Sequence, residues 1–215
     1  MFKKVSIRLV VSFLAFVLLA YVIMQYGFAD PHKAGLITQK LRKPDFHYSP
    51  WIYVLYLHIV SACLAVAIGP FQLFIQPKRK GIRRHRILGY TYVLSITASG
   101  LISIYLSIFA TGGWMAGLGF FVLDVLWVLS TWVAVRKAVN KQIQAHREWM
   151  LRSYALTLAA VTFRVWLITL TPLFGGPLEP PYRLSAWMCW IGNLIFIEVL
   201  IRLSRKKAVS KSLTA

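Results

Sequence analysis

The chain has 215 residues, of which 58% are hydrophobic and only 14% are charged, and its formal net charge is +19 at pH 7. A water-soluble domain of this length has too few charged residues to cover so much apolar surface, whereas lipid is a matching solvent for apolar side chains. The basic residues lie in short clusters between long apolar runs, as in membrane proteins, which argues against nucleic acid as a partner.

Apolar runs of about 20 residues are long enough to cross the roughly 30 Å hydrocarbon core of a bilayer. We therefore predict an all-α, polytopic membrane helix bundle with about six transmembrane helices. Its expected organisation is a first transmembrane helix within 1–28, an outer loop at 29–50, a five-helix membrane domain at 51–201 and a basic cytoplasmic tail at 202–215. The predicted spans are about 9–28, 51–76, 87–110, 114–135, 149–171 and 185–201.

The basic residues also predict the orientation of the chain. With a cytoplasmic N-terminus, 19 of the 25 Lys and Arg residues fall on inner segments and five on outer segments. The positive-inside rule therefore places both termini in the cytoplasm, and we expect a plasma membrane location, with anionic lipid headgroups drawn to the basic inner face. The tail from about Ser204 is polar, so we expect it to be disordered.

Three ionisable side chains are predicted at membrane depth: His58 in the second span, Asp124 in the fourth and Arg164 in the fifth. At 1.5 Å per helical residue, all three lie roughly 10–15 Å below the outer face. Ionisable groups are costly in lipid and mark functional sites. Two interpretations follow: an Asp124–Arg164 ion pair that locks two helices, or a proton-handling or anion-binding site in which His58 titrates. Glu198 is nearer the inner face, where we expect a local pair with Arg202.

Each of the four middle spans carries small and polar residues along one helical face. Small residues let helices approach closely, and polar residues need partners away from lipid. These spans are therefore expected to form a four-helix core with the faces inward, and the first and last spans should pack outside it. The faces hold His58, Ala65, Gly69 and Gln72; His85, Tyr92, Ser99 and Ser103; Gly117, Asp124 and Thr131; and His146, Ser153, Thr157, Ala160 and Arg164.

A second candidate site lies at the inner ends of the third and fifth spans. His85 and His146 can face each other there, and two imidazoles so placed suit the axial positions of haem b. Arg84 and Arg147 would suit the haem propionates. The alternatives are a divalent metal with Glu148 as a third ligand, although no HxH or HExxH spacing is present, and two histidines that only hydrogen-bond at the interface.

Proline at position 70 should bend the second span, because it removes one backbone hydrogen bond. Gln72 is expected to help satisfy the carbonyl group that Pro70 leaves without a partner.

Several motifs together resemble an uncharacterised family of bacterial predicted membrane proteins, the domain of unknown function 2306. The resemblance covers roughly residues 50–170 and implies a small multi-helix membrane protein, without supplying an activity. The motifs are His58, Gly69-Pro70-Phe71-Gln72, His85-Arg86-Ile87-Leu88-Gly89, Thr111-Gly112-Gly113, His146-Arg147-Glu148-Trp149-Met150-Leu151-Arg152-Ser153-Tyr154-Ala155-Leu156 and Arg164.

A weaker resemblance is to the cytochrome b561-like di-haem bundle, which places histidines on four successive helices and pairs alternate ones. His85 and His146 are similar to one such pair. The other pair is incomplete, because His58 faces Asp124 rather than a histidine in the pattern. This resemblance implies at most a single haem.

Three functions are consistent with these features: haem-dependent electron transfer in the membrane, transport of a small solute or proton through the His58, Asp124 and Arg164 cluster, and a non-catalytic assembly subunit. The chain has no nucleotide-binding glycine loop, no GxSxG and no zinc-protease motif, so no catalytic residue is predicted. The sequence does not identify a protein partner.

Overall fold

The structure is a computed structural model that describes all residues except 1, 42–45, 75–80 and 214–215. The described part of the chain is helical, and six of its helices are long and apolar enough to cross a membrane. An all-α polytopic bundle with six spans is therefore confirmed. Its elements are α1 (Phe2–Ile23), η1 (Met24–Phe28), η2 (Pro31–Lys33), α2 (Gly35–Leu41), α3 (Tyr48–Phe74), α4 (Ile82–Ile108), α5 (Trp114–Val139), α6 (Ile143–Thr157), α7 (Ala159–Phe174) and α8 (Glu179–Leu213).

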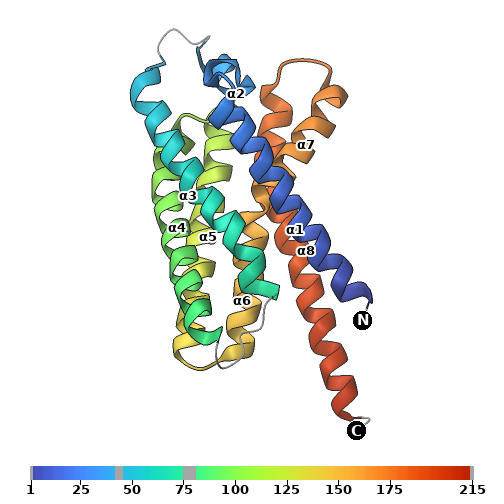
Figure 1. Ribbon diagram of the computed structural model, residues 1–215. Coiled ribbons are helices and arrows are strands. Elements are labelled where there is room, and N and C mark those ends of the chain that lie inside the picture. The colour runs from blue at the N-terminus through green and yellow to red at the C-terminus, as the bar shows by residue number, and fades with distance from the viewer. Residues whose placement is uncertain (1, 42–45, 75–80, 214–215) are drawn as a thin grey trace.

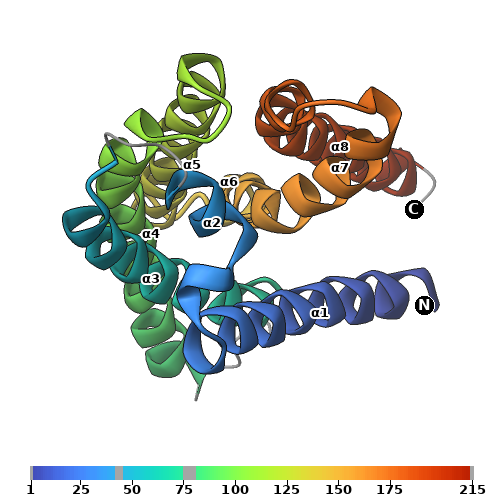
Figure 2. The same cartoon turned by 90° about the horizontal axis from the view of Figure 1, so that it is seen from above.

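Helices α3, α4, α5 and α6 form a closed core in which each helix packs against two others (Figure 1). α1 packs outside this core against α3 and α7, and α8 packs against α5, α6 and α7. Seen from above, α1 lies on one side of the molecule and α7 and α8 on another, with α2 over the outer end between them (Figure 2). This arrangement is the predicted four-helix core with the first and last spans outside, except that α7, the outer half of the fifth span, packs mainly against α8.

The polar faces of the core helices point inward, as predicted. Ser99 of α4, Thr131 of α5 and Ser153 of α6 have no exposed surface. Close packing accompanies this burial: a Cβ atom added to Gly100 would overlap the side chain of Val128 on α5. Small residues thus allow the backbones to approach, as is usual where helices associate in lipid.

Pro70 lies inside α3, and the carbonyl that it leaves without a helical donor is satisfied by a residue other than the predicted one. Proline lacks the N–H that would bond to the carbonyl group of Val66 four residues earlier. The hydroxyl group of Tyr154, on α6, donates to that Val66 carbonyl oxygen at 3.3 Å. The Gln72 amide instead donates to the backbone carbonyl of His85 at 3.0 Å. The expected role of Gln72 is wrong, because a tyrosine from a distant segment already donates to this carbonyl.

The fifth span is broken near its middle, which the sequence analysis did not predict. α6 ends at Thr157 and α7 begins at Ala159, although the whole segment Ile143–Phe174 is apolar enough to be one span. At the break, the carbonyl of Leu158 accepts from the N–H of Val161 at 2.9 Å and from that of Thr162 at 3.1 Å, so a three-residue step is added to the usual four-residue one. Local tightening of this kind often marks a hinge.

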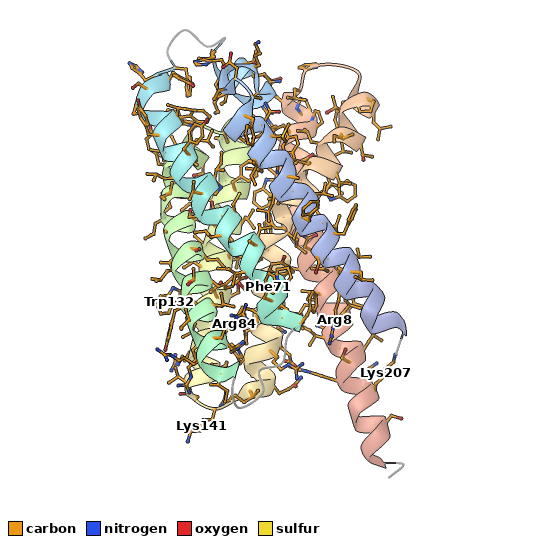
Figure 3. All side chains as sticks on the ribbon, in the orientation of Figure 1. Arg8, Phe71, Arg84, Trp132, Lys141 and Lys207 are labelled. Carbon is orange, nitrogen blue, oxygen red and sulfur yellow. The ribbon has the colours of Figure 1, made fainter. Side chains whose placement is uncertain are left out.

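Both chain termini lie at the same end of the molecule, and α2 lies at the other end (Figure 1). Arg84, Lys141 and Lys207 lie toward the end that carries the termini (Figure 3). Lys78, Arg79 and Lys80, which the charge pattern predicts on an inner segment, lie outside the described residues. We refer below to the end with the termini as the inner end.

The C-terminal tail is helical in the described residues. α8 continues to Leu213, so the expectation of a disordered tail is wrong up to that residue.

At the outer end, the backbone N–H of His32 donates to the Asp30 side chain at 3.0 Å, and this hydrogen bond caps the start of η2. This hydrogen bond and the adjacent His32 ring hold the pKa of the Asp30 carboxyl below its usual value.

Candidate functional site

A cavity of about 510 Å³ lies between the helices in the outer part of the bundle. Residues from all six spans and from α2 line it, and most of the lining side chains are apolar. Its volume is in the range of pockets that bind small molecules. Ala34 and Lys40 line its outer end, whereas Val66, Trp127 and Leu156 line its inner end near the middle of the bundle.

The cavity brings together the three ionisable residues predicted at membrane depth. His58 reaches it from α3, Asp124 from α5 and Arg164 from α7. The three positions are far apart in sequence, and they meet because each lies on the inward face of its helix. The structure therefore places the predicted intramembrane cluster around one space.

His58 and Asp124 are connected through serine side chains of α4. The Nδ1 atom of His58 lies 2.9 Å from the hydroxyl oxygen of Ser99 and 2.8 Å from that of Ser103. The Ser103 hydroxyl also lies close enough to the Asp124 carboxyl to interact with it. A chain of hydrogen-bonding groups thus runs from α3 through α4 to α5. The sequence pattern predicted that both serines face inward, but it did not predict their hydrogen bonds to His58.

Arg164 has a different environment. One of its terminal N–H groups donates to the carbonyl oxygen of Ala160 at 2.6 Å, and its guanidinium lies 5.1 Å from the ring centroid of Tyr21 on α1. Among the described residues, no carboxylate lies within salt-bridge distance of Arg164. The Asp124–Arg164 ion pair considered above is therefore not formed, because Asp124 faces α4 and Arg164 folds along its own helix.

A layer of polar side chains lies directly below the cavity. The Tyr92 hydroxyl is 3.0 Å from the Ser153 hydroxyl and 3.2 Å from that of Thr157. The Trp127 indole N–H donates to Thr157 at 2.9 Å, and Thr131 is 2.7 Å from Ser153. All five residues are buried. This hydrogen-bonded layer links α4, α5 and α6 between the cavity and the inner end.

The inner histidine pair is separate from the cavity, whose described lining includes neither His85 nor His146. The Nδ1 atom of His146 donates to the Ala134 carbonyl at 2.8 Å, and His85 is close enough to interact with His146 electrostatically. Arg84 and Arg147 are exposed nearby in sequence. The described residues contain no group of three His, Cys, Asp or Glu side chains that could hold a metal ion.

Two carboxylates at the inner end bind arginines across helices. Glu148 is 4% exposed and accepts from Nε of Arg205 at 2.8 Å, with a second contact to the same guanidinium. Glu148 is thereby engaged with α8 instead of serving as a third metal ligand. Glu198 pairs with Arg152 of α6, not with Arg202 as expected, because α6 and α8 pack side by side.

Comparison with known protein families gives a match. The model of a family described as predicted membrane protein (DUF2306) matches residues 55–201, from the outer part of α3 to the inner part of α8. No curated protein and no solved structure shows significant similarity. The matched segment contains His58, Asp124 and Arg164, whereas α1 and α2, which also line the cavity, precede it. The resemblance drawn from the motifs is thereby confirmed, and the cytochrome b561-like resemblance stays a prediction.

Proposed function

The chain belongs to the DUF2306 family of predicted membrane proteins, and we propose that it is a carrier that binds a small, largely apolar solute in the membrane and couples its movement to a proton. The observation that carries this proposal is that one cavity is lined by His58, Asp124 and Arg164 together. Ionisable groups that line an intramembrane cavity are typical of substrate and proton pathways.

Proton coupling is supported by the contacts between His58, Ser103 and Asp124. Imidazole and carboxyl groups each hold or release a proton, and a hydroxyl group can both donate and accept a hydrogen bond. The titratable or charged side chains that line the same cavity are Tyr21, Tyr26, Lys40, His58, Cys63, Asp124, Arg164, Tyr182 and Cys189. His58 and Asp124 both contact Ser103, so we propose that these two residues carry the coupled proton.

Movement of the solute is supported by the broken fifth span. Leu156, Thr157, Ala159 and Ala160, which flank the break, all line the cavity. Discontinuous membrane helices commonly form the substrate sites of transporters. The polar layer around Tyr92 lies below the cavity, so the described conformation corresponds to a carrier that is closed on its inner side.

The test is proton uptake into proteoliposomes that contain a trapped pH-sensitive dye. Small amphipathic solutes are added outside under an inward proton gradient, and we expect one class to acidify the lumen faster than in protein-free vesicles. His58→Gln or Asp124→Asn should reduce this solute-dependent rate by about tenfold or more, the scale of losing a positioned proton-transfer group. Glu179→Gln, which removes an exposed carboxylate outside the cavity, is the matched control.

The proposal fails if no solute accelerates acidification, or if His58→Gln and Asp124→Asn both keep the rate of the Glu179→Gln control. Folding of each variant is checked by size-exclusion chromatography and by its Tm, so a loss of rate in a correctly folded variant is informative.

We also propose the orientation and the domain organisation given by the charge pattern: cytoplasmic termini in a plasma membrane, an outer loop at 29–50, and anionic lipid headgroups at the inner face. The basic residues Arg84, Lys141 and Lys207 lie near the end that holds the termini (Figure 3). A fluorescent-protein fusion at the C-terminus should be fluorescent in cells, whereas alkaline phosphatase inserted after Lys141 should be inactive. Active phosphatase at Lys141 would contradict this orientation.

A second candidate function is electron transfer through a single haem b at the inner end. The Nδ1–H of His146 donates to Ala134, which leaves Nε2 with the lone pair that a metal would use. His85 would supply the other axial ligand, and Arg84 and Arg147 would face the propionates. Protein produced with ample haem should show a Soret band that is lost in His85→Ala and in His146→Ala. Colourless, folded wild-type protein would rule this candidate out.

A further inference from the structure

We infer that the ligand of the cavity is an amphiphilic monoanion, with an acidic head group on the Arg164 guanidinium and an apolar tail along the aromatic wall of α5, α7 and α8. This inference rests on the proposed carrier function and specifies its substrate class. It is carried by three observations: the charge of Arg164 without a carboxylate partner, the fixed position of its guanidinium, and the apolar wall that adjoins it.

The first observation is the charge balance around Arg164. A guanidinium stays protonated in proteins, and a charge at membrane depth needs a counterion or a polar partner. No described carboxylate lies within salt-bridge distance of Arg164, and Asp124, the one acidic side chain among the described lining residues, interacts with Ser103. An anionic ligand would supply the negative charge that balances the Arg164 guanidinium.

The second observation is that the guanidinium is already positioned. Its bond to the Ala160 carbonyl and its place against the Tyr21 ring restrain the side chain at two points. Only one of the five N–H groups of a guanidinium is used by the bond to Ala160. The remaining donors form a planar fork that matches a carboxylate, sulfonate or phosphate group better than a point charge does.

The third observation is the apolar wall next to Arg164. Phe120 of α5, Phe163 of α7 and Tyr182 of α8 pack edge to face, with centroid distances of 5.4 Å between the two phenylalanines and 5.1 Å between Phe163 and Tyr182. All three line the cavity together with Leu167, one helical turn beyond Arg164. A ligand that uses both features must combine one acidic group with an apolar tail.

Arg164 belongs to the segment matched by the family, whereas Tyr21 belongs to α1, which precedes that segment. Tyr21, which lies outside the matched segment, is a positioning residue of the site. Its ring, not its hydroxyl, contacts the guanidinium. Tyr21→Phe should leave anion binding unchanged, and Tyr21→Leu should weaken it.

The test compares three probes with the same eight-carbon tail, binding to the full chain in lipid nanodiscs: octane-1-sulfonate, octanol and octyltrimethylammonium. Binding is followed by tryptophan fluorescence, since Trp51 and Trp127 line the cavity. We expect the sulfonate to bind at least about tenfold more tightly than the other two probes, the scale of a charge-assisted bidentate contact. Arg164→Gln should remove that preference and leave octanol binding unchanged, and the exposed Arg86→Gln serves as the matched control.

Two further probes distinguish whether the acidic ligand comes from water or from the membrane. Octanoate is added from water, and oleate is supplied in the nanodisc bilayer. Tighter binding of octanoate supports a water-borne substrate, and tighter binding of oleate supports one drawn from the lipid phase. Equal affinities for the three eight-carbon probes, or a sulfonate preference that survives Arg164→Gln in folded protein, would overturn the inference. Proton-linked uptake of a neutral or cationic solute that depends on His58 and Asp124 would overturn it too, while leaving the proposed carrier function intact.

Discussion

Two glycines in the interiors of membrane helices, Gly69 of α3 and Gly89 of α4, differ in what faces them. A Cβ atom on Gly69 would overlap the ring of Tyr154, whereas one on Gly89 would have no atom within 4 Å. Their roles therefore differ although their residue type and helical setting are the same. Gly69 is required by the contact between α3 and α6, and Gly89 is not required by packing.

This difference gives a direct prediction. Gly69→Ala should lower the free energy of unfolding by about 1–3 kcal/mol, because the Tyr154 ring must move out of a packed core. Gly89→Ala should be neutral or should raise it by up to about 1 kcal/mol through helix propensity. Both variants are unfolded with SDS in mixed micelles and compared with wild type. Equal effects of the two substitutions would contradict the described contact.

The hydroxyl group of Tyr154 gives a second prediction at this scale. Tyr154→Phe should cost about 0.5–1 kcal/mol, because it leaves the Val66 carbonyl without the donor that Pro70 cannot provide. In a Pro70→Ala background the helix supplies its own N–H, so the same substitution should cost less. A double-mutant cycle of unfolding free energies measures the difference, and identical costs in both backgrounds would show that the hydroxyl does not serve this carbonyl.

At the scale of elements, α8 is attached to α6 by two ion pairs at the inner end. Glu148 is buried, whereas the side chain of its partner Arg205 is 61% exposed. Removing the arginine leaves a carboxylate of low exposed area without its charged partner, while removing the carboxylate leaves an exposed arginine that water can solvate. The two substitutions should therefore have unequal effects.

We expect Arg205→Gln to lower the Tm by several degrees and Glu148→Gln to lower it by clearly less, in detergent at constant ionic strength. The exposed Glu179→Gln is the control for removal of a carboxylate. A larger loss in Glu148→Gln than in Arg205→Gln would mean that the pair is solvated and that α8 is not held at this point.

The elements themselves could be predicted where hydrophobicity decides them. The six spans follow from apolar length, and the inward faces follow from the period of small and polar residues, which is why Asp124 and Arg164 were placed beside His58. The break at Leu158 could not be predicted, because a leucine between Thr157 and Ala159 carries no local sign of a helix end. Contacts between distant segments, such as those of Tyr21 with Arg164 and of Glu198 with Arg152, depend on packing and have no signal in a single sequence.

At the scale of the whole molecule, the bundle has two zones of different character along its long axis. The outer zone contains the cavity lined by residues of all six spans, and the zone below it contains the buried polar layer of Tyr92, Thr131 and Ser153. The cavity should therefore be reached by water-borne molecules from the outer side alone, while the layer should be closed to them.

The central claim is that ligands enter this cavity from the outer side, and cysteine labelling tests it most directly. Ser103, which lines the cavity, and Ser153, which lies in the layer below, are each replaced by cysteine in a Cys63→Ala, Cys189→Ala background. A charged, membrane-impermeant thiol reagent added outside proteoliposomes should modify the Ser103→Cys variant, with protection by octane-1-sulfonate, and should leave the Ser153→Cys variant unmodified. Equal labelling at both positions, or labelling of Ser103→Cys from the inside only, would contradict the account.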